Sequence, residues 1–104
     1  MKVLLINGSP HAKGCTYTAL CEVANSLEKE GVGTEIMHVG VRPISGCIGC
    51  GYCKKAGLGR CVFDEDTVNA AIEKAEVADG FIFGSPVHYA GASGAVTSFL
   101  DRCF

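Results

Sequence analysis

Two stretches, "NGSPHAKGCT" at residues 7–16 and "FGSPVHY" at residues 83–89, contain the same tripeptide Gly-Ser-Pro. Each stretch overlaps or directly follows a short apolar run, "KVLLI" at residues 2–6 and "FIF" at residues 81–83. Short runs rich in branched or aromatic residues and bounded by Gly and Pro are typical of strands buried on both faces. The sequence therefore predicts two buried strands that end in the same kind of loop.

Helical patterns separate these runs, and another apolar run predicts a further strand. The expected helices cover residues 16–30, residues 64 or 66 to 78 and residues 92–104, and the further strand covers residues 34–39. Thr16 is the expected N-cap of the first helix, which turns Leu20, Val23, Ala24 and Leu27 toward the core. Asp64 or Asp66 is the expected cap of the second helix. The βαβαβα order predicts an α/β fold with a doubly wound parallel sheet and right-handed crossovers.

The two Gly-Ser-Pro loops are expected to lie side by side. In one common order of such sheets the first and third strands are neighbours, and ligands bind beyond their carboxyl ends. The first loop leads into a helix N-terminus, which suits a phosphate, and its polar side chains are those of Ser9, His11, Lys13 and Thr16. The loop is neither a Walker A motif nor G-x-G-x-x-G, so it favours a mononucleotide over a dinucleotide.

The second loop offers apolar, aromatic and hydrogen-bonding groups in the stretch Pro86-Val87-His88-Tyr89. This mixture suits a flat ring that needs apolar contacts and a few polar partners. A plainer interpretation stays open, because Gly and Pro after strands are common turn residues. On that interpretation His11 and His88 are ordinary surface histidines and Tyr89 fills the core.

Composition excludes several classes of protein. The 104 residues suffice for one small domain, and 48 % of them are hydrophobic against 19 % charged, which predicts a folded chain. The net charge of −2 and the lack of a basic stretch argue against nucleic acid as a partner. The apolar runs are too short to span a bilayer, and the first one ends too early for a signal peptide, so we expect a cytoplasmic protein with no membrane partner.

Seven cysteines are present, and four of them, Cys47, Cys50, Cys53 and Cys61, cluster in a predicted loop at residues 40–63. Long loops without periodicity are usually functional. A cysteine cluster in a chain without an export signal favours a metal or redox site over disulfides. Cys21 and Cys103 fall in predicted helices and are expected to be packing residues, and Cys15 is not an expected ligand.

The motifs "GSPHAKGCT" and "GSPVHYAG", the latter followed by "SFLDR", resemble those of the flavodoxin-like NAD(P)H-dependent FMN reductase family. The resemblance covers nearly the whole chain and implies that FMN is the cofactor and NAD(P)H a diffusible reductant. It implies that the first loop holds the phosphate and that the second borders the isoalloxazine ring. The implied flavin-binding residues are Ser9, His11, Gly14, Cys15, Thr16, Tyr17, Ser85, Pro86, Val87, His88 and Tyr89. Two departures stand out, because His11 replaces a frequent Arg and Cys15 a frequent Asn.

The stretch "CIGCGYCKKAGLGRC" at residues 47–61 resembles the compact cysteine motif of the iron–sulfur flavoproteins, a branch of this family. That resemblance implies a [4Fe–4S] cluster held by Cys47, Cys50, Cys53 and Cys61. Four thiolates match the four corners of such a cluster, and they also suit zinc. Unligated thiols remain an alternative, because spacing shows capacity rather than occupancy.

The resemblance implies an FMN-dependent oxidoreductase that transfers reducing equivalents from NAD(P)H to an acceptor. The flavin carries the redox chemistry, so no side chain is expected to act as a catalytic acid or base. His88 and Tyr89 are the expected residues that orient the flavin or a second substrate. One alternative is an iron–sulfur flavoprotein that passes electrons between cluster and FMN. Another is a non-catalytic flavodoxin-like module with a structural zinc.

The family's sheet has five strands, and residues 1–104 supply only the first three βα units of this FMN-binding domain. The expected order leaves one edge of the third strand unpaired, and its apolar "FIF" lacks the charges or prolines that protect an edge. We therefore expect that the chain is a fragment of a longer protein or completes its sheet with another chain, as in a homo-oligomer. In either case its own affinity for FMN is expected to be weaker than that of the complete fold.

Overall fold

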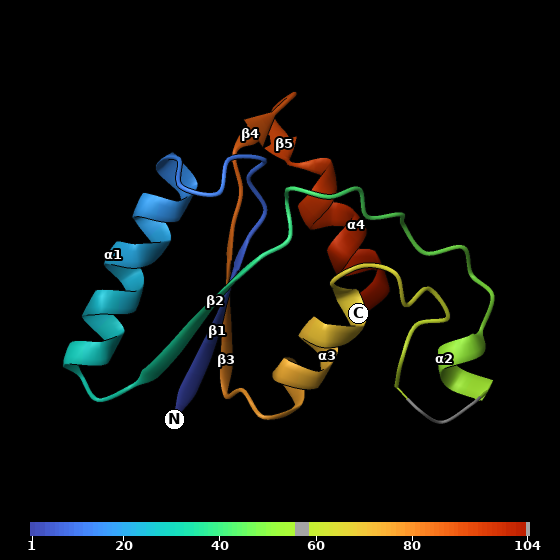
Figure 1. Cartoon of the computed structure of the whole chain (residues 1–104), viewed down its shortest axis with the longest axis horizontal. Coiled ribbons are helices and arrows are strands. Elements are labelled where there is room, and N and C mark those ends of the chain that lie inside the picture. Colours follow the sequence, from blue (N-terminus) through green and yellow to red (C-terminus); the bar gives the residue numbers. More distant parts are fainter. Residues whose placement is uncertain (56–58, 104) are drawn as a thin grey trace.

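The computed structural model describes residues 1–55 and 59–103, with Lys55 described by its backbone alone (Figure 1). Residues 56–58 of the predicted cysteine loop and Phe104 of the last predicted helix lie outside the described residues. At the centre is a parallel sheet with the strand order β2-β1-β3. The strands are β1 (Lys2–Asn7), β2 (Gly33–His38) and β3 (Gly80–Gly84). The predicted α/β fold is confirmed, with the third strand beside the first.

Helices cover both faces of the sheet (Figure 1). Helix α1 (Cys15–Lys29) lies against one face, and α3 (Val68–Glu76) and α4 (Gly94–Cys103) lie against the other. The central strand β1 supplies alternate residues to each side, because successive side chains of a strand point to opposite faces. Leu4 and Ile6 pack in the core under α3 and α4, and Val3 and Leu5 pack in the core under α1. The strand is therefore buried on both faces, as its sequence predicted.

The helix boundaries differ from the predicted ones at their starts. The N-cap of α1 is Gly14 rather than the predicted Thr16, and no side chain caps it. The predicted core position Val23 is 37 % exposed, whereas Leu20 and Ala24 are buried. Helix α3 begins only at Val68, although Asp66 does accept a hydrogen bond from the Val68 amide at 3.1 Å. The differences at the helix starts arise because several residues near a helix end fit the same pattern equally well.

Two short elements were not expected from the sequence. Helix α2 (Tyr52–Lys55) interrupts the predicted cysteine loop. A two-stranded hairpin of β4 (Val87–His88) and β5 (Gly91–Ala92) precedes α4, so this helix starts at Gly94 rather than at Ala92. In the described part of the chain, no helix is both long and apolar enough to cross a membrane.

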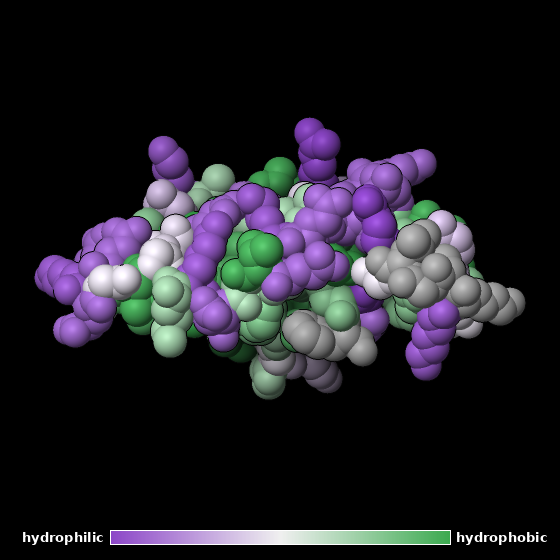
Figure 2. All heavy atoms as spheres, turned by 90° about the horizontal axis from the view of Figure 1, so that it is seen from below, coloured by the Kyte–Doolittle hydropathy of each residue, from purple (hydrophilic) through white to green (hydrophobic). Residues whose placement is uncertain are grey.

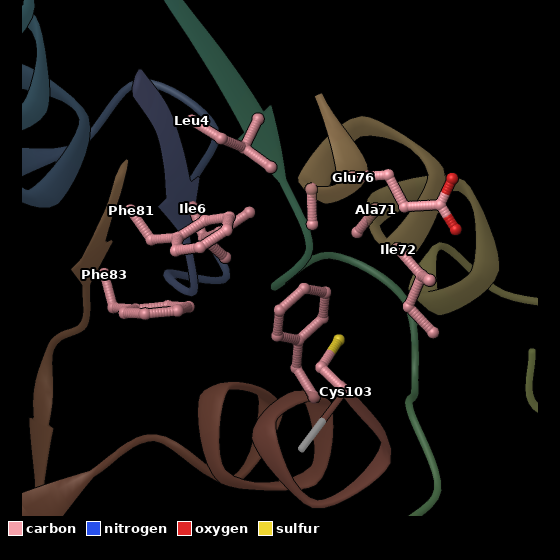
Figure 3. A pocket seen from close by; sticks show the side chains of 10 residues that line it. Leu4, Ile6, Ala71, Ile72, Glu76, Phe81, Phe83 and Cys103 are labelled. Atoms are coloured by element: carbon pink, nitrogen blue, oxygen red, sulfur yellow. The ribbon is translucent and has the colours of Figure 1, made fainter. Parts of the chain in front are cut away.

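The prediction that the third strand is buried on both faces is wrong. Phe81 and Phe83 of β3 are each 39 % exposed, and their rings stack at a centroid distance of 6.5 Å. Within the described residues β3 pairs only with β1, which leaves its other edge open. Both rings point from β3 toward α3 and α4 into an apolar cavity of about 230 Å³ (Figure 3). Its lining includes Ile6, Ile72 and Cys103.

Most of the surface seen from below is hydrophilic, and apolar atoms reach it near the middle of that face (Figure 2). The exposed large hydrophobic residues include the two phenylalanines of β3 and Val77, which follows α3. Scattered apolar residues are normal on a protein surface, but contiguous apolar area is not. In the three-stranded sheet, the exposed large hydrophobic side chains are therefore those of β3, beside its open edge.

Candidate functional site

The two Gly-Ser-Pro loops meet at the carboxyl ends of β1 and β3. The amide of Gly8 donates to the carbonyl oxygen of Gly84 at 2.9 Å, which continues the pairing of the two strands into the loops. A Cβ atom at Gly8 would lie 2.0 Å from Cγ2 of Val96, so a side chain at this position would clash with α4. The structure thus brings together the two motifs that the sequence placed side by side, at the upper end of the sheet in Figure 1.

Ser93 links the two loops to α4 and was not among the predicted site residues. Its hydroxyl donates to the carbonyl oxygen of Gly8 at 3.0 Å and accepts from the amide of Val96 at 3.3 Å. Its own amide donates to the hydroxyl of Ser85 at 2.8 Å. A serine directly before a helical apolar pattern is an N-cap signal, and that signal could have revealed the cap but not the bond to Gly8.

The first loop is held in shape by its own polar groups. Oδ1 of the buried Asn7 accepts from the amide of Ser9 at 3.0 Å, and the Ser9 hydroxyl accepts from the amide of His11 at 3.1 Å. Nε2 of His38 lies 2.6 Å from the Ser9 carbonyl oxygen. Ser9 is only 4 % exposed, so its hydroxyl faces the loop, whereas the His11 side chain is exposed. His38 is a further residue of the site, and no sequence pattern singled it out.

The N-terminus of α1 follows this loop and is suited to an anion. No side chain caps the helix at Gly14, and its first turn contains no acidic residue. The first amide groups of a helix have no partner within the helix and carry the positive end of its dipole. The predicted phosphate-binding residues Cys15, Thr16 and Tyr17 contribute these amides. A phosphate is the kind of group that such a helix start binds.

The second loop forms the β4–β5 hairpin and presents its tip to solvent. Tyr89 and Ala90 have φ angles of 48° and 59°, which two-residue hairpin turns favour but which non-glycine residues rarely adopt. Such left-handed geometry costs ~1–2 kcal/mol per residue. Tyr89 is fully exposed and Val87 is largely exposed. The interpretation that Tyr89 fills the core is therefore wrong, and its contact with a flat ring stays a prediction. Non-glycine residues held in strained turns cluster at ligand sites.

The Ser85 hydroxyl is engaged within its own loop. It donates to the carbonyl oxygen of Pro86 at 2.7 Å and accepts from Ser93. Pro86 is half-buried, and His88 is exposed beside Tyr89. The described structure thus places Val87, His88 and Tyr89 where a ligand has access, and Ser85 where it shapes the loop.

The four predicted metal-ligating cysteines line one cavity of about 410 Å³. Cys47, Cys50 and Cys53 are exposed, and Cys61 is half-buried. Among the described residues, no three His, Cys, Asp or Glu side chains are close enough together to hold a metal ion. The structure therefore gathers the four thiols around one space without bringing them to ligating distance. The apolar residues expected to shield them also line it, namely Ile48, Tyr52, Val62 and Phe63.

Two glycines and one hydrogen bond to sulfur shape the backbone around these cysteines. Gly49 and Gly51 have φ angles of 70° and 76°, so they allow the tight turns between successive cysteines. The amide of Gly49 donates to the sulfur of Cys47 at 3.3 Å. Hydrogen bonds to the sulfurs are one of the factors that set the potential of an iron–sulfur cluster. The donor set fits thiolate chemistry of this kind.

Comparison with known proteins defines the class. The family model described as NADPH-dependent FMN reductase matches residues 1–104, and the fold is the corresponding partial flavodoxin-like α/β sheet. The chain belongs to the NADPH-dependent FMN reductase family. This confirms the resemblance on which the flavin-binding residues were predicted, although the residues themselves stay predictions.

The similar curated proteins are named iron-sulfur flavoproteins. One from Methanocaldococcus jannaschii is 37 % identical over 102 residues, which is 98 % of this chain and 51 % of that protein. One from Archaeoglobus fulgidus is 34 % identical over 102 residues, covering 98 % and 48 % of the two chains. One from Clostridioides difficile is 32 % identical over 104 residues, covering 98 % and 45 %. The chain spans about half the length of the curated relatives it matches, and the names confirm the predicted branch.

Proposed function

We propose that the chain binds FMN above the carboxyl ends of β1 and β3 and belongs to an oxidoreductase that moves reducing equivalents from NAD(P)H to an acceptor. The observation that carries this proposal is the Gly8–Gly84 hydrogen bond, which joins the two loops at one site. Family membership supports FMN as the ligand. Bound FMN supplies the redox chemistry, and the protein orients it and excludes competing reactions.

One group of site residues would bind the phosphate of FMN, and another group would contact its ring. The uncapped start of α1, with Thr16 and the exposed His11, would hold the phosphate. The exposed tip of the hairpin, with Val87 and Tyr89, would lie against the ring. The buried amide nitrogen of Asn7 has no hydrogen-bond partner among the described residues, which leaves one unused donor beneath the loop. This donor set fits a phosphorylated flavin.

Comparing FMN with riboflavin tests the proposal, because riboflavin lacks the phosphate. We expect the wild-type chain to bind FMN at least tenfold more tightly, measured by quenching of flavin fluorescence. The double variant His11→Ala/Thr16→Ala keeps the backbone amides of α1 and is expected to reduce that preference while its riboflavin affinity stays unchanged. Ser26→Ala, at an exposed position of α1, is the matched control. Failure of the wild type to bind FMN, or equal binding of both flavins, would reject the assignment.

A second candidate function has its own support. We propose that Cys47, Cys50, Cys53 and Cys61 hold an iron–sulfur cluster, which would pass electrons to or from the flavin. The shared cavity and the Gly49–Cys47 hydrogen bond favour it, and the relatives' names support it. Iron and sulfide analysis of anaerobically prepared protein tests it. Cys50→Ser is expected to lose iron, whereas Cys21→Ser, on α1, is expected to keep it. Absence of iron and sulfide from the wild type leaves free thiols or zinc.

We also propose that two copies of this chain associate through β3. The open edge of β3 is apolar, and Phe81 and Phe83 are partly exposed beside the cavity in Figure 3. Antiparallel pairing of two β3 strands about an axis normal to the sheet would place the phenylalanines of both copies on one face. The association would cover apolar area and supply partners to edge backbone groups.

A further inference from the structure

Arg102, in the last turn of α4, is a charged residue enclosed by the protein. Its side chain is 1 % exposed, and the carboxylate that faces it, that of Asp66, is 14 % exposed. Nη1 of Arg102 bonds Oδ2 of Asp66, and Nη2 bonds Oδ1 at 3.1 Å. This is the two-pronged geometry in which Arg and carboxylate interact most specifically. The pair leaves the remaining donors of the guanidinium free to bind other groups.

Those remaining donors reach both ends of the cysteine loop. Nη1 donates to the carbonyl oxygen of Ser45 at 3.3 Å, and Nη2 donates to the carbonyl oxygen of Phe63 at 2.8 Å. The guanidinium carbon also lies 5.3 Å from the centroid of the Phe63 ring. Ser45 precedes the first of the four cysteines and Phe63 follows the last. One side chain therefore ties the beginning and the end of the loop to α4.

The fifth donor of the guanidinium is directed at a predicted ligand. Nε of Arg102 donates to the sulfur of Cys61 at 3.3 Å. The backbone of Cys61 is fixed as well, because the buried Asn69 accepts from its amide at 2.8 Å and donates to its carbonyl oxygen at 3.0 Å. The other three cysteines are exposed. Of the four predicted ligands, Cys61 is therefore the one that the fold holds in place before a cluster binds.

We infer that Arg102 is a positioning residue for the cluster, fixing Cys61 and favouring the reduced state of the cluster through its charge and its N–H···S bond. This inference rests on the proposed iron–sulfur function. Reduction adds negative charge to the cluster and its thiolates. A nearby buried cation and a hydrogen bond to a ligand sulfur stabilise that charge, which raises the reduction potential. Asp66 offsets part of the charge of Arg102, so it lowers the potential.

A purely structural ion pair would behave differently under mutation. Removing either partner of a buried pair leaves a charge without compensation and destabilises the fold. If the pair is only structural, Arg102→Gln and Asp66→Asn are expected to destabilise the fold to a similar extent. A role in tuning predicts opposite effects on the potential, because one variant removes positive charge near Cys61 and the other removes negative charge.

The test is a dithionite titration of the anaerobically prepared, iron-loaded protein, followed by visible and electron paramagnetic resonance spectra. We expect Arg102→Gln to shift the reduction equilibrium at least tenfold toward the oxidised cluster, which is about 59 mV for one electron. Asp66→Asn is expected to shift it the opposite way. Lys29→Gln is the matched control, because it also removes one positive charge, but Lys29 is exposed at the end of α1, against the opposite face of the sheet.

Two further variants keep the inference open to rejection if Arg102→Gln does not fold. Arg102→Lys keeps the charge but loses the fork of donors, and its potential is expected to lie between those of the wild type and Arg102→Gln. Asn69→Ala frees the backbone of Cys61 and is expected to lower the iron content, with Ser26→Ala as its control. Iron content is measured for every variant alongside the potential.

The outcomes separate the inference from the proposed function. A wild-type protein that takes up no iron would reject the cluster, and the role of Arg102 with it. A wild type with a cluster whose potential is unchanged in iron-loaded Arg102→Gln and Asp66→Asn would reject the role of Arg102 alone. Shifts of both variants in the same direction would also reject it. Opposite shifts, with no shift in Lys29→Gln, would support it.

Discussion

The hydroxyl of Ser93 donates to the carbonyl oxygen of Gly8 at 3.0 Å, across a separation of 85 residues. The same hydroxyl caps α4 by accepting from the Val96 amide. One small side chain therefore joins the start of the last described helix to the first loop. The contact therefore links α4 to the loop that is proposed to bind FMN.

Ser93→Ala should weaken both the fold and the site. The variant removes a helix cap and leaves the Gly8 carbonyl without this donor, which together cost ~1–3 kcal/mol. We expect the free energy of unfolding in urea to fall by that amount and FMN affinity to fall with it. Thr97→Ala is the control, because the exposed Thr97 bonds only carbonyl oxygens of the same turn, and its cost is expected to stay below ~0.5 kcal/mol. Equal losses in the two variants would contradict the role of Ser93.

Tyr89 and Ala90 form a matched pair for testing the hairpin tip. Each has a positive φ angle, so glycine at either position relieves strain. We expect Tyr89→Gly and Ala90→Gly to leave stability unchanged or raise it by up to ~1 kcal/mol, because relief of strain outweighs the added freedom of the unfolded chain. Only Tyr89→Gly removes a ring, so only this variant is expected to weaken riboflavin and FMN binding. Equal flavin affinity in both variants would show that Tyr89 does not contact the ring.

The open edge of β3 predicts concentration-dependent association. Static light scattering of the wild type is expected to show a dimer that Phe83→Lys converts to a monomer, because a charge on an edge strand opposes strand pairing. Val77→Lys is the control, since Val77 is 69 % exposed but lies outside β3. A wild type that stays monomeric at every concentration would contradict association through this edge.

Cys103 should be a slow-reacting thiol. Burial raises the pKa of Cys103 from 9.0 to about 11, with a smaller opposing effect of the nearby Arg102 charge. The thiolate is the reactive form, so we expect Cys103 to be labelled far more slowly than the exposed Cys15 at pH 8 in the apo-protein. Peptide mapping after timed alkylation measures the two rates. Similar rates would contradict the burial of the Cys103 thiol.

The same shift makes stability depend on pH in a defined window. The folded state holds the Cys103 proton more tightly than the unfolded state, whose thiol has the ordinary value of 9.0. The contribution is therefore fully present below pH 9 and is lost as pH rises from 9 to about 11. Cys103→Ala is expected to flatten the decline of unfolding free energy over this range. If the unfolding free energy of the variant declines as steeply as that of the wild type, the decline is due to titratable groups other than Cys103.

Much of the fold and the location of the site could be predicted from the sequence. The apolar runs identified β1, β2 and β3, and the strand order followed from the general behaviour of doubly wound sheets. This placed the two Gly-Ser-Pro loops together, and the Gly8–Gly84 hydrogen bond confirms it. The prediction that the third strand is buried was wrong, because an apolar run indicates a strand but not how completely the rest of the chain covers its side chains.

The partners of individual polar groups could not be predicted. His38 and Ser93 lie in none of the motifs, and the motif "SFLDR", which ends at Arg102, does not indicate what its guanidinium binds. Each of the three acquires its role from residues distant in the chain, such as Cys61 for Arg102. Two residues of the β4–β5 turn, Tyr89 and Ala90, have positive φ angles. Glycine at these positions would have predicted a turn, but the sequence has none there. The hairpin was therefore missed for lack of the usual turn residues.

The order of strands and helices and the resemblance to the family follow from the sequence alone, because local periodicity and turn residues govern local conformation. Three features became visible only in the folded chain: the polar groups that hold the two loops, the bond of Arg102 to Cys61 alone among the four cysteines, and the open edge of β3 in the described residues. The reason is that a hydrogen bond or a covered edge depends on the distance between groups in space, and a linear pattern specifies only their separation along the chain.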